Sequence, residues 1–260
     1  MGEYFRNAYD RSLIENSSKR INVVIPMAGA GSRFAIAGYD TPKPFIKFNN
    51  KMMIEHVLGS FKSVDAKFIL VLQEKFLTEQ KKQLEELKSK YRLNFVTVPK
   101  LTMGAAITAL AAHKEIDEKY DIVFADSDNI FRHTDIRNFI SYARSNDLSG
   151  ALLTITSDKS CYSYAKTDKN GYLVETKEKD VISNHAITGV YYFKSLQQFR
   201  NSVIDLVVES DLSKGEFYMS NVYNHLKKIT NKIGVYDIEH FDCVGTPEQL
   251  KEYIERGANE

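Results

Sequence analysis

The chain has 260 residues, of which 43% are hydrophobic and 27% charged, so it can build a sizeable core and has an ordinary globular composition. Its formal net charge of +1 excludes a global field that would recruit nucleic acid or an anionic membrane. Two distant cysteines, Cys161 and Cys243, argue against a disulfide scaffold and favour a reducing, cytoplasmic compartment. Neither a spanning helix nor a secretory signal is expected, because no long apolar stretch exists.

The first part of the chain alternates apolar runs with helical patterns. Residues 1–20 are polar and are expected to form an N-terminal extension. Apolar runs predict buried strands over 21–27, 67–72, 93–98 and 121–125. Helical spacing or an alanine-rich composition predicts helices over 52–62, 75–90 and 104–113. Strands that alternate with helices imply an α/β fold with a mostly parallel sheet and crossover helices on its faces.

After about residue 150 the pattern becomes richer in strands. Strand-like runs fill most of 151–193, and Asn170-Gly171 within them is a strong hairpin signal. Further elements are expected as helices over 195–209, 216–229 and 247–256 and as a strand over 232–238. No repeat or Pro/Gly-rich linker interrupts the chain. We therefore predict a single domain over 21–260, with an α/β half at about 21–150 and a more β-rich half at about 151–260.

A glycine-rich loop, PMAGAGSRF at 26–34, directly follows the first predicted strand. Gly29 and Gly31 permit close backbone approach, and successive N–H groups in such a loop suit an anion. The loop lacks the Gly-Lys-Ser/Thr end of a Walker A sequence, and Phe34 stands where a dinucleotide fingerprint needs glycine. Taken alone, the loop fits a strand-to-helix corner without a ligand as well as it fits a phosphate site.

The longer segment VIPMAGAGSRFAIAGYDTPKPFIKFNNKMMIEHVL resembles the signature of the sugar-phosphate nucleotidyltransferase superfamily. Two blocks carry the resemblance, AGAGSR at 28–33 and PKP at 42–44. The resemblance implies a Rossmann-like, GT-A-type fold in which a nucleotide half precedes an acceptor half. It implies transfer of a nucleoside monophosphate from a nucleoside triphosphate (NTP) to a phosphorylated acceptor, with release of pyrophosphate.

Positioning and electrostatics, rather than covalent chemistry, drive such a transfer, so fixed cations and N–H donors are the suitable groups. By resemblance, Arg33 neutralises the leaving pyrophosphate and Lys43 contacts the phosphates at the reacting centre. Gly104 matches a glycine that opens a helix beside the nucleobase. The nucleotide-binding residues implied in this way are Met27, Ala28, Gly29, Ala30, Gly31, Ser32, Gly104 and Asp126.

An acidic turn, DSDNIF at 126–131, follows the fourth predicted strand. Asp126 and Asp128 stand at the carboxyl end of that strand, which is the edge where open α/β sheets bind ligands. Two carboxylates suit a hard cation such as Mg²⁺, although Asp pairs also serve turns and helix caps. The run SDNIF resembles the family's G-D-N-I-F block. The resemblance implies Mg²⁺ binding by Asp128, with Asp126 as a second candidate.

The segment NGYLVETKEKDVISNHAITGVYYF resembles the acceptor half of the family. A Glu-Lys pair of the family is matched either by Glu175 with Lys177 or by Glu178 with Lys179, and spacing to Ser183 favours Lys177. A lysine there would hold the acceptor phosphate, although a charge run is also a common solvated face. The string GEFYMSNVYNHL resembles a further acceptor element, whose aromatic residues also fit a helix core. The acceptor-binding residues implied are Lys177, Asn184, Thr188, Gly189, Glu216 and Tyr218.

One motif departs from the family pattern. HFDCVGTPEQL resembles a D-x-G-T-P-x-x-L motif whose Asp can be a second metal ligand, but Cys243 stands at that position. Asp242 precedes it by one residue, which on a strand points the side chain to the opposite face. Asp242 is therefore a metal candidate only if the backbone is irregular there.

Several substrates and two other functions fit parts of this pattern. Sugar 1-phosphates are one acceptor class; the other is non-sugar phosphates such as phosphocholine or a phosphorylated amino acid, used by a CTP-dependent cytidylyltransferase. Bacterial surface-polysaccharide (capsule and lipopolysaccharide) pathways use both, and the length and D-x-D turn favour CTP. The PKP block argues against a GT-A glycosyltransferase. Intact Arg33, Lys43 and Asp128 argue against a non-catalytic nucleotide-binding homologue. A homodimer is expected only on general frequency.

Overall fold

The computed structural model describes residues 19–257, so the expected extension 1–20 lies outside the described residues except for Lys19 and Arg20. The strands are β1 (Ile21–Pro26), β2 (Lys47–Phe48), β3 (Lys51–Met52), β4 (Ala66–Gln73), β5 (Leu93–Val98), β6 (Ile122–Ala125), β7 (Asn129–Ile130), β8 (Gly150–Thr156), β9 (Ser163–Thr167), β10 (Leu173–Glu178), β11 (His185–Phe193), β12 (Ile233–Ile238) and β13 (Asp242–Cys243). The helices are α2 (Ser32–Ile36), α3 (Met53–Gly59), α4 (Phe76–Glu79), α5 (Lys81–Lys90), α6 (Ala105–Leu110), α7 (His133–Ser145), α8 (Leu196–Val208), α9 (Met219–Ile229) and α10 (Pro247–Gly257), with 3-10 turns η1 (Lys43–Phe45) and η2 (Ala111–Lys114).

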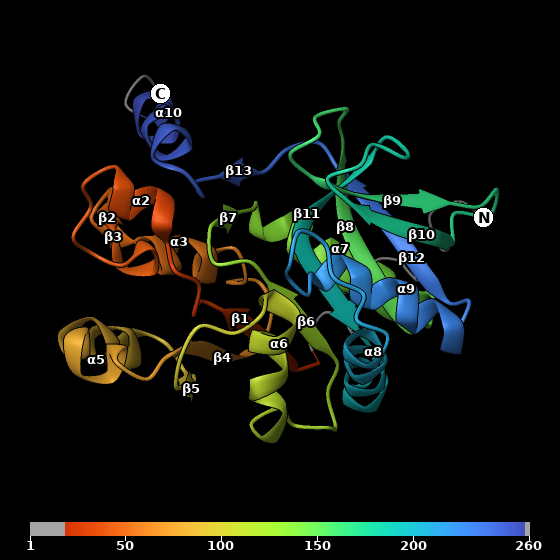
Figure 1. The fold of residues 1–260 in the computed structure, drawn as a ribbon, viewed down its shortest axis with the longest axis horizontal. Helices are drawn as coiled ribbons and strands as arrows, with labels where there is room; N and C mark the ends of the chain where they lie inside the picture. The colour runs from red at the N-terminus through yellow and green to blue at the C-terminus, as the bar shows by residue number, and fades with distance from the viewer. Residues whose placement is uncertain (1–18, 258–260) are drawn as a thin grey trace, which may run out of the picture.

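A nine-stranded mixed sheet runs through the molecule (Figure 1). Its main path has the order β10-β9-β11-β6-β1-β4-β5, and β8 pairs with both β11 and β12. Strands β6, β1, β4 and β5 are parallel neighbours, as the alternation of strands and helices predicts. Strand β11 is antiparallel to β6, β8 and β9, so it joins the two halves of the chain. The predicted Rossmann-like α/β fold is confirmed.

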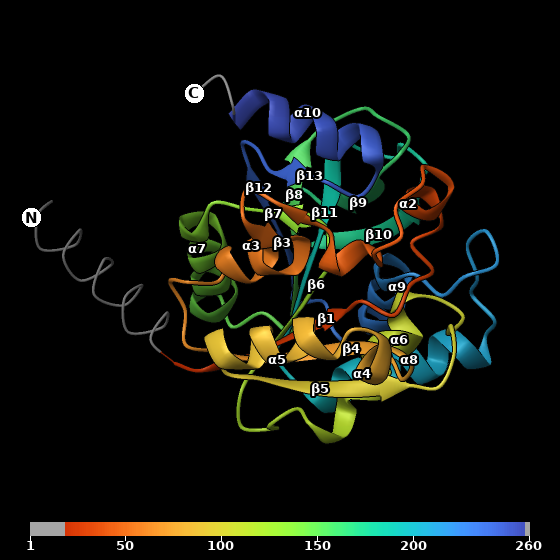
Figure 2. The same cartoon turned by 90° about the vertical axis from the view of Figure 1, so that its left-hand side faces the viewer.

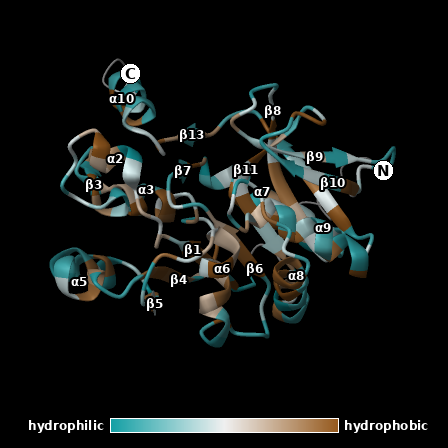
Figure 3. Ribbon diagram, in the orientation of Figure 1, coloured by the Kyte–Doolittle hydropathy of each residue, from teal (hydrophilic) through white to brown (hydrophobic). Residues whose placement is uncertain are grey.

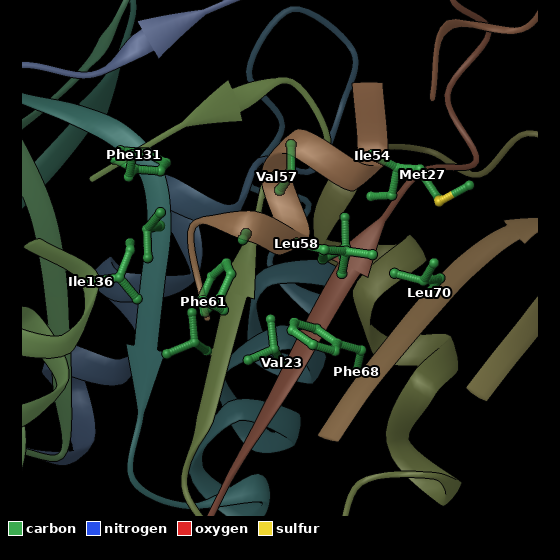
Figure 4. Close-up of a cluster of buried hydrophobic side chains, with 14 of the residues drawn as sticks. Val23, Met27, Ile54, Val57, Leu58, Phe61, Phe68, Leu70, Phe131 and Ile136 are labelled. Atoms are coloured by element: carbon green, nitrogen blue, oxygen red, sulfur yellow. The ribbon is translucent and has the colours of Figure 1, made fainter. Parts of the chain in front are cut away.

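Helices cover both faces of the sheet because the buried strands alternate their apolar side chains between two cores. One core joins α3, α5 and α7 to one face, and the other joins α6, α8 and α9 to the opposite face. Figure 4 shows part of the first core, where Val23 of β1 and Phe68 of β4 lie near Leu58 and Phe61. Hydrophobic residues concentrate on the central strands and on α8 (Figure 3). In residues 19–257, no helix combines the length and apolar character needed to cross a membrane.

The segment that follows the glycine-rich loop packs on a third, smaller core. Phe34 of α2 packs there with Met53 of α3 and with Val244 and Leu250 from the C-terminal part of the chain. Helix α10 and strand β13 lie together at one end of the molecule in both views (Figures 1 and 2). The C-terminal segment therefore supports the loop that follows β1.

Element boundaries differ from the sequence-based prediction in three places. The helix predicted over 75–90 is divided at Gln80 into α4 and α5. The helix predicted over 216–229 begins at Met219, because its N-cap residue Tyr218 is extended and Phe217 exchanges backbone hydrogen bonds with Met103 and Ala106. Helix α7 was not predicted, although its buried residues Ile136, Phe139, Ile140 and Ala143 have helical spacing. The hairpin predicted at Asn170-Gly171 is confirmed, since it joins antiparallel β9 and β10.

Asn22 is a fully buried polar residue within β1. Its Nδ2 donates to the carbonyl oxygens of Asp117, Tyr120 and Asp121 at 3.0, 3.2 and 3.2 Å, and its Oδ1 accepts from the backbone N–H of Asp117 at 3.1 Å. One side chain thus satisfies the backbone of the turn that leads into β6. The position of β6 beside β1 depends on this bonding.

Asn22→Ala should lower the free energy of unfolding by about 1–2 kcal/mol, because the part-buried carbonyl oxygen of Tyr120 and the N–H of Asp117 lose the partner that Asn22 provides. The measurement is urea unfolding followed by circular dichroism. The matched control is Asn94→Ala, which removes only an exposed hydrogen bond to Glu115 and should cost about 0.5 kcal/mol or less. Equal costs for the two variants would contradict this role of Asn22.

Candidate active site

The glycine-rich loop begins where β1 ends. The backbone N–H of Met27 continues the sheet by donating to the carbonyl oxygen of Val71 at 2.8 Å. Gln73 of β4 holds the next residue, since its Nε2 donates to the carbonyl oxygen of Ala28 at 2.9 Å. Gly29 and Ala30 are exposed, whereas Met27 and Ala28 are buried. These two hydrogen bonds hold the backbone at the start of the loop, and the tip of the loop is exposed. Because the side chains of Met27 and Ala28 are buried, only their backbone groups can contact a ligand.

Lys43 lies directly against this loop. A Cβ atom at Gly31 would stand 3.4 Å from the Cβ atom of Lys43, so the loop and the PKP segment are in van der Waals contact. The Nζ atom of Lys43 donates to Oδ2 of Asp128 at 2.7 Å. The end of β1, the PKP segment and the acidic turn after β6 thus meet at one point, as the sequence motifs suggested.

The acidic turn is fixed by its contact with β11. The backbone N–H of Asp126 donates to the carbonyl oxygen of Gly189 at 2.9 Å. Gly189 has a φ of +80°, and a Cβ atom there would lie only 2.2 Å from Oδ2 of Asp126. Asn129 donates through Nδ2 to the carbonyl oxygen of Thr188 at 2.9 Å. Glycine at 189 is required because the Asp126 carboxylate occupies the space of any side chain.

The charges of the site perturb one another strongly. Burial and the neighbouring charge of Asp128 raise the pKa of Asp126 above its usual range. Burial opposes protonation of Lys43, but the charge and hydrogen bond of Asp128, helped by Asp126, outweigh it and raise the lysine pKa above its ordinary value. Lys43 is therefore a permanent cation at neutral pH. A cluster of this kind, in a cavity, is typical of a functional site.

A cavity of about 470 Å³ opens beside the acidic turn. Its lining includes the charged and polar residues Arg33, Asp126, Asp128, Asn129, Glu178 and Lys179 and the aromatic residues Tyr162, Tyr191, Tyr218 and Phe241. A second cavity, of about 340 Å³, borders Ala30, Gly31, Lys43 and Gln73. The loop and Lys43 therefore face one hollow, and Arg33 and the acidic turn face the other. Both volumes lie in the range that is usual for small-molecule binding sites.

Glu178 and Lys179 line the cavity, where Lys177 was expected. Strand β10 shifts its register between Leu173 and Glu175, which reverses the alternation of its side chains. Thr176 is consequently buried and Lys177 exposed, while Glu178 turns inward. Oε2 of Glu178 accepts hydrogen bonds from the hydroxyls of Ser163 and Ser220. The preference for Lys177 is thus corrected in favour of the other pair that the sequence allowed.

Lys179 is held between an acid and an aromatic ring. Its Nζ atom lies 3.9 Å from Oε1 of Glu178 and 5.5 Å from the ring centre of Tyr218. A cation over an aromatic face is attracted to the ring, so the lysine keeps its position at the cavity wall.

Other residues predicted on the acceptor side divide into two groups. Thr188, Gly189 and Tyr218 line the cavity. Asn184 and Glu216 are exposed and do not line it. Sequence reasoning missed the aromatic wall of Tyr162 and Phe241, because isolated aromatic residues in strands and loops carry no motif.

Gly104 has a packing role in the structure. A Cβ atom there would stand 2.5 Å from the carbonyl oxygen of Phe217, so glycine allows α6 to begin against the extended segment before α9. Its neighbour Ala105 lines the cavity. The nucleobase contact of Gly104 stays a prediction.

Asp242 lies away from the acidic turn. Its Oδ1 accepts hydrogen bonds from His240, at 2.8 Å, and from Arg256, and it borders a separate hollow. Cys243, on the opposite side of β13, lines the cavity instead. Burial and the charge of Asp128 raise the pKa of the Cys243 thiol to about 12, so it is neutral at physiological pH. The backbone of β13 is regular, and Asp242 therefore does not join Asp126 and Asp128.

Asp126, Asp128 and Asn129 are the groups best suited to hold a hard cation. All three line the cavity, and the Oδ1 atom of buried Asn129 has no hydrogen-bond partner. Since the Nδ2 atom of Asn129 is committed to a carbonyl group, the amide orientation is fixed. Within residues 19–257, no three His, Cys, Asp or Glu side chains form a metal site. Such a donor set matches Mg²⁺, which keeps waters and substrate oxygens among its ligands.

Solved structures of other proteins share the fold of this chain. The chain resembles a nucleoside-diphosphate-sugar pyrophosphorylase from Vibrio cholerae RC9 with a TM-score of 0.77 and 23% identity, covering 90% of this chain and 99% of that one. It also resembles the inositol-1-phosphate CTP transferase from T. maritima, with a TM-score of 0.71 and 16% identity over 92% of this chain and 94% of that one. These similarities establish a shared fold.

The family is established by sequence. A model described as nucleotidyl transferase matches residues 22–253, and the chain belongs to this family. One curated relative is the bifunctional protein GlmU of Clostridium tetani, 22% identical over 88% of this chain and 50% of that protein. Another is the 2-C-methyl-D-erythritol 4-phosphate cytidylyltransferase of Buchnera aphidicola, 24% identical over 64% of this chain and 67% of that protein. The chain thus spans about half the length of its GlmU relatives.

Gly189→Ala should be far more destabilising than Gly171→Ala. Both glycines have a positive φ, +80° and +82°, but a Cβ atom at Gly171 meets nothing within 4 Å. Gly171→Ala therefore costs about 1 kcal/mol of backbone strain, whereas Gly189→Ala adds displacement of Asp126 and should cost about 3 kcal/mol or more. Urea unfolding of the two variants measures the difference. Similar costs would show that the space beside Asp126 is not restrictive.

Proposed function

We propose that this chain transfers a nucleoside monophosphate from an NTP to a phosphorylated acceptor and releases pyrophosphate. The observation that carries the proposal is the meeting of the glycine-rich loop, Lys43 and the acidic turn between two cavities. One, of about 340 Å³, borders the loop and Lys43, and the other, of about 470 Å³, borders the acidic turn. Attack at the α-phosphorus builds negative charge on the equatorial oxygens and on the departing pyrophosphate. Fixed cations and backbone N–H groups stabilise that charge without moving, which is the principal source of catalysis in phosphoryl chemistry.

Each group on the nucleotide side has a distinct task in this proposal. Backbone N–H groups of Gly29, Ala30, Gly31 and Ser32 bind the triphosphate. Lys43, a permanent cation, contacts the phosphates at the reacting centre, and Arg33 neutralises the leaving pyrophosphate. The backbone of Lys43 is anchored within η1, so its side chain starts from a fixed point beside the loop when the substrate arrives.

Asp126 and Asp128 would hold Mg²⁺ in the functioning protein, with Oδ1 of Asn129 as a third oxygen donor. Bound there, the ion would neutralise phosphate oxygens and bring the two substrates together. The protein's own contribution is to fix the turn, through the contact of Asp126 with Gly189 and the bond of Asn129 to Thr188. The spacing of these oxygens therefore depends on β11.

The acceptor would occupy the half of the cavity lined by Lys179, Tyr218 and Thr188. Lys179 supplies a positive charge for the acceptor phosphate, and Glu178 supplies a carboxylate for a hydroxyl or amine of the same molecule. A sugar 1-phosphate, in bacterial surface-polysaccharide precursor synthesis, is the first candidate. The similarity to a nucleoside-diphosphate-sugar pyrophosphorylase supports it.

A second candidate is CTP-dependent cytidylyl transfer to a non-sugar phosphate. Two similarities favour it: a 2-C-methyl-D-erythritol 4-phosphate cytidylyltransferase in sequence and an inositol-1-phosphate CTP transferase in structure. The aromatic wall formed by Tyr162 and Phe241 also suits an acceptor with few hydroxyl groups. The two candidates differ only in base and acceptor, so one assay separates them.

Pyrophosphate release should be detected with one of the four NTPs and a matching phosphorylated acceptor in the presence of Mg²⁺. The acceptor panel contains sugar 1-phosphates, phosphocholine and phosphorylated amino acids, and a coupled phosphate assay reads the product. Dependence on both substrates distinguishes transfer from NTP hydrolysis. Absence of release with every pair would leave nucleotide binding without catalysis as the function.

Lys43→Ala should reduce turnover by about 100- to 1000-fold, because it removes one fixed donor from the reacting centre. The measurement is kcat for pyrophosphate release with the best substrate pair. Unfolding midpoints must be compared in parallel, since Lys43→Ala also leaves Asp128 without its partner. Turnover near that of the unmodified protein would exclude this role of Lys43.

Asp128→Asn should reduce turnover strongly, whereas Asp242→Asn should change it by about twofold at most, as for a substitution outside the site. The two changes are chemically identical, but Asp242 bonds His240 and Arg256 rather than facing the cavity. The comparison uses kcat at saturating Mg²⁺. A larger loss for Asp242→Asn would assign the cation to the β13 side.

A further inference from the structure

The Lys43–Asp128 ion pair connects the two groups that the proposed function needs separately. Nζ of Lys43 lies 2.7 Å from Oδ2 of Asp128, although the residues are 85 positions apart in sequence. Their side chains are only 22% and 19% exposed, so water screens the pair poorly. In the substrate-free protein, Lys43, the proposed phosphate ligand, and Asp128, the proposed cation ligand, neutralise each other's charge.

Surrounding groups leave the bonded oxygen little room for another ligand. A Cβ atom at Gly245 would lie 2.5 Å from Oδ2 of Asp128, so the chain after β13 packs against the same oxygen. Asp126 and Cys243 are the other titratable groups that act on Lys43. The lysine ammonium and a divalent ion would therefore compete for the charge of one carboxylate, and their like charges would repel each other at that distance.

We infer that Lys43 masks Asp128 until the triphosphate draws the lysine away, so that cation and nucleotide bind cooperatively rather than independently. This inference rests on the proposed function. Phosphate oxygens replace Asp128 as the partner of Lys43, and the released carboxylate accepts the cation. Linkage makes the effect reciprocal: whatever removes the lysine strengthens cation binding, and whatever removes the carboxylate strengthens polyphosphate binding.

The first test measures Mn²⁺ binding to the full chain without nucleotide, by electron paramagnetic resonance of free Mn²⁺. Lys43→Met should bind Mn²⁺ at least about tenfold more tightly than the unmodified protein, which corresponds to about 1.4 kcal/mol. Lys43→Arg keeps the charge and should show no gain. Lys47→Met is the matched control, because Lys47 pairs with Glu86 on the surface. In Lys43→Met with Asp128→Asn, the gain should disappear.

The second test measures binding of inorganic tripolyphosphate in EDTA by calorimetry, and it decides the matter if Lys43→Met does not fold. Asp128→Asn should bind tripolyphosphate several-fold more tightly than the unmodified protein. Asp242→Asn makes the same chemical change away from Lys43, because Asp242 bonds His240 and Arg256, and it should show no such gain.

Unchanged or weaker Mn²⁺ binding by Lys43→Met would overturn the inference, as would a gain that survives Asp128→Asn. An equal gain in tripolyphosphate binding for Asp128→Asn and Asp242→Asn would also overturn it. Neither measurement depends on turnover. Failure of the masking model is therefore distinguishable from failure of the proposed reaction, which the pyrophosphate assay tests alone.

Discussion

The buried contact between Asp126 and Gly189 is the constraint on which the site depends. The Asp126 carboxylate fills the space where every residue except glycine has its Cβ atom, and the Asp126 N–H bonds the Gly189 carbonyl oxygen. This contact fixes the turn that carries Asp128 and Asn129, and through Asp128 it fixes the end of the Lys43 side chain. A backbone conformation in β11 thus sets the geometry of groups that come from β1, η1 and β6.

Opposed charges in the site explain how it stays folded without substrate. Carboxylates at Asp126, Asp128 and Glu178 lie near one another, as their mutual effect on the pKa of Asp126 shows. Ion pairs with Lys43 and Lys179, and the hydroxyls of Ser163 and Ser220, compensate most of this charge. The oxygen of Asn129 has no such partner. The charges of the site are therefore largely paired with one another. A ligand can bind only if it offers these side chains better partners than the ones they already have.

The motifs of the nucleotide side meet in the structure as the sequence indicated, whereas the lysine favoured on the acceptor side does not line the cavity, and the reasons are physical. The loop, Lys43 and the acidic turn each follow a buried strand, and parallel strands deliver their carboxyl ends to one edge of a sheet. Lys177 was favoured wrongly because the register shift in β10 reverses which residues face inward. No local residue pattern marks such a bulge. Asp242 and Cys243, by contrast, follow the simple alternation of a strand.

Strand β11 pairs with β6 of the nucleotide half and with β8 and β9 of the acceptor half, so both halves share one continuous sheet. Hinge rotation between rigid lobes, which many two-part enzymes use to enclose their substrates, would have to break the hydrogen bonds of this strand. The backbone frame of the cavity is consequently set during folding. Enclosure of a substrate falls to the side chains and loops around it, and the range of acceptors can change there without disturbing the frame.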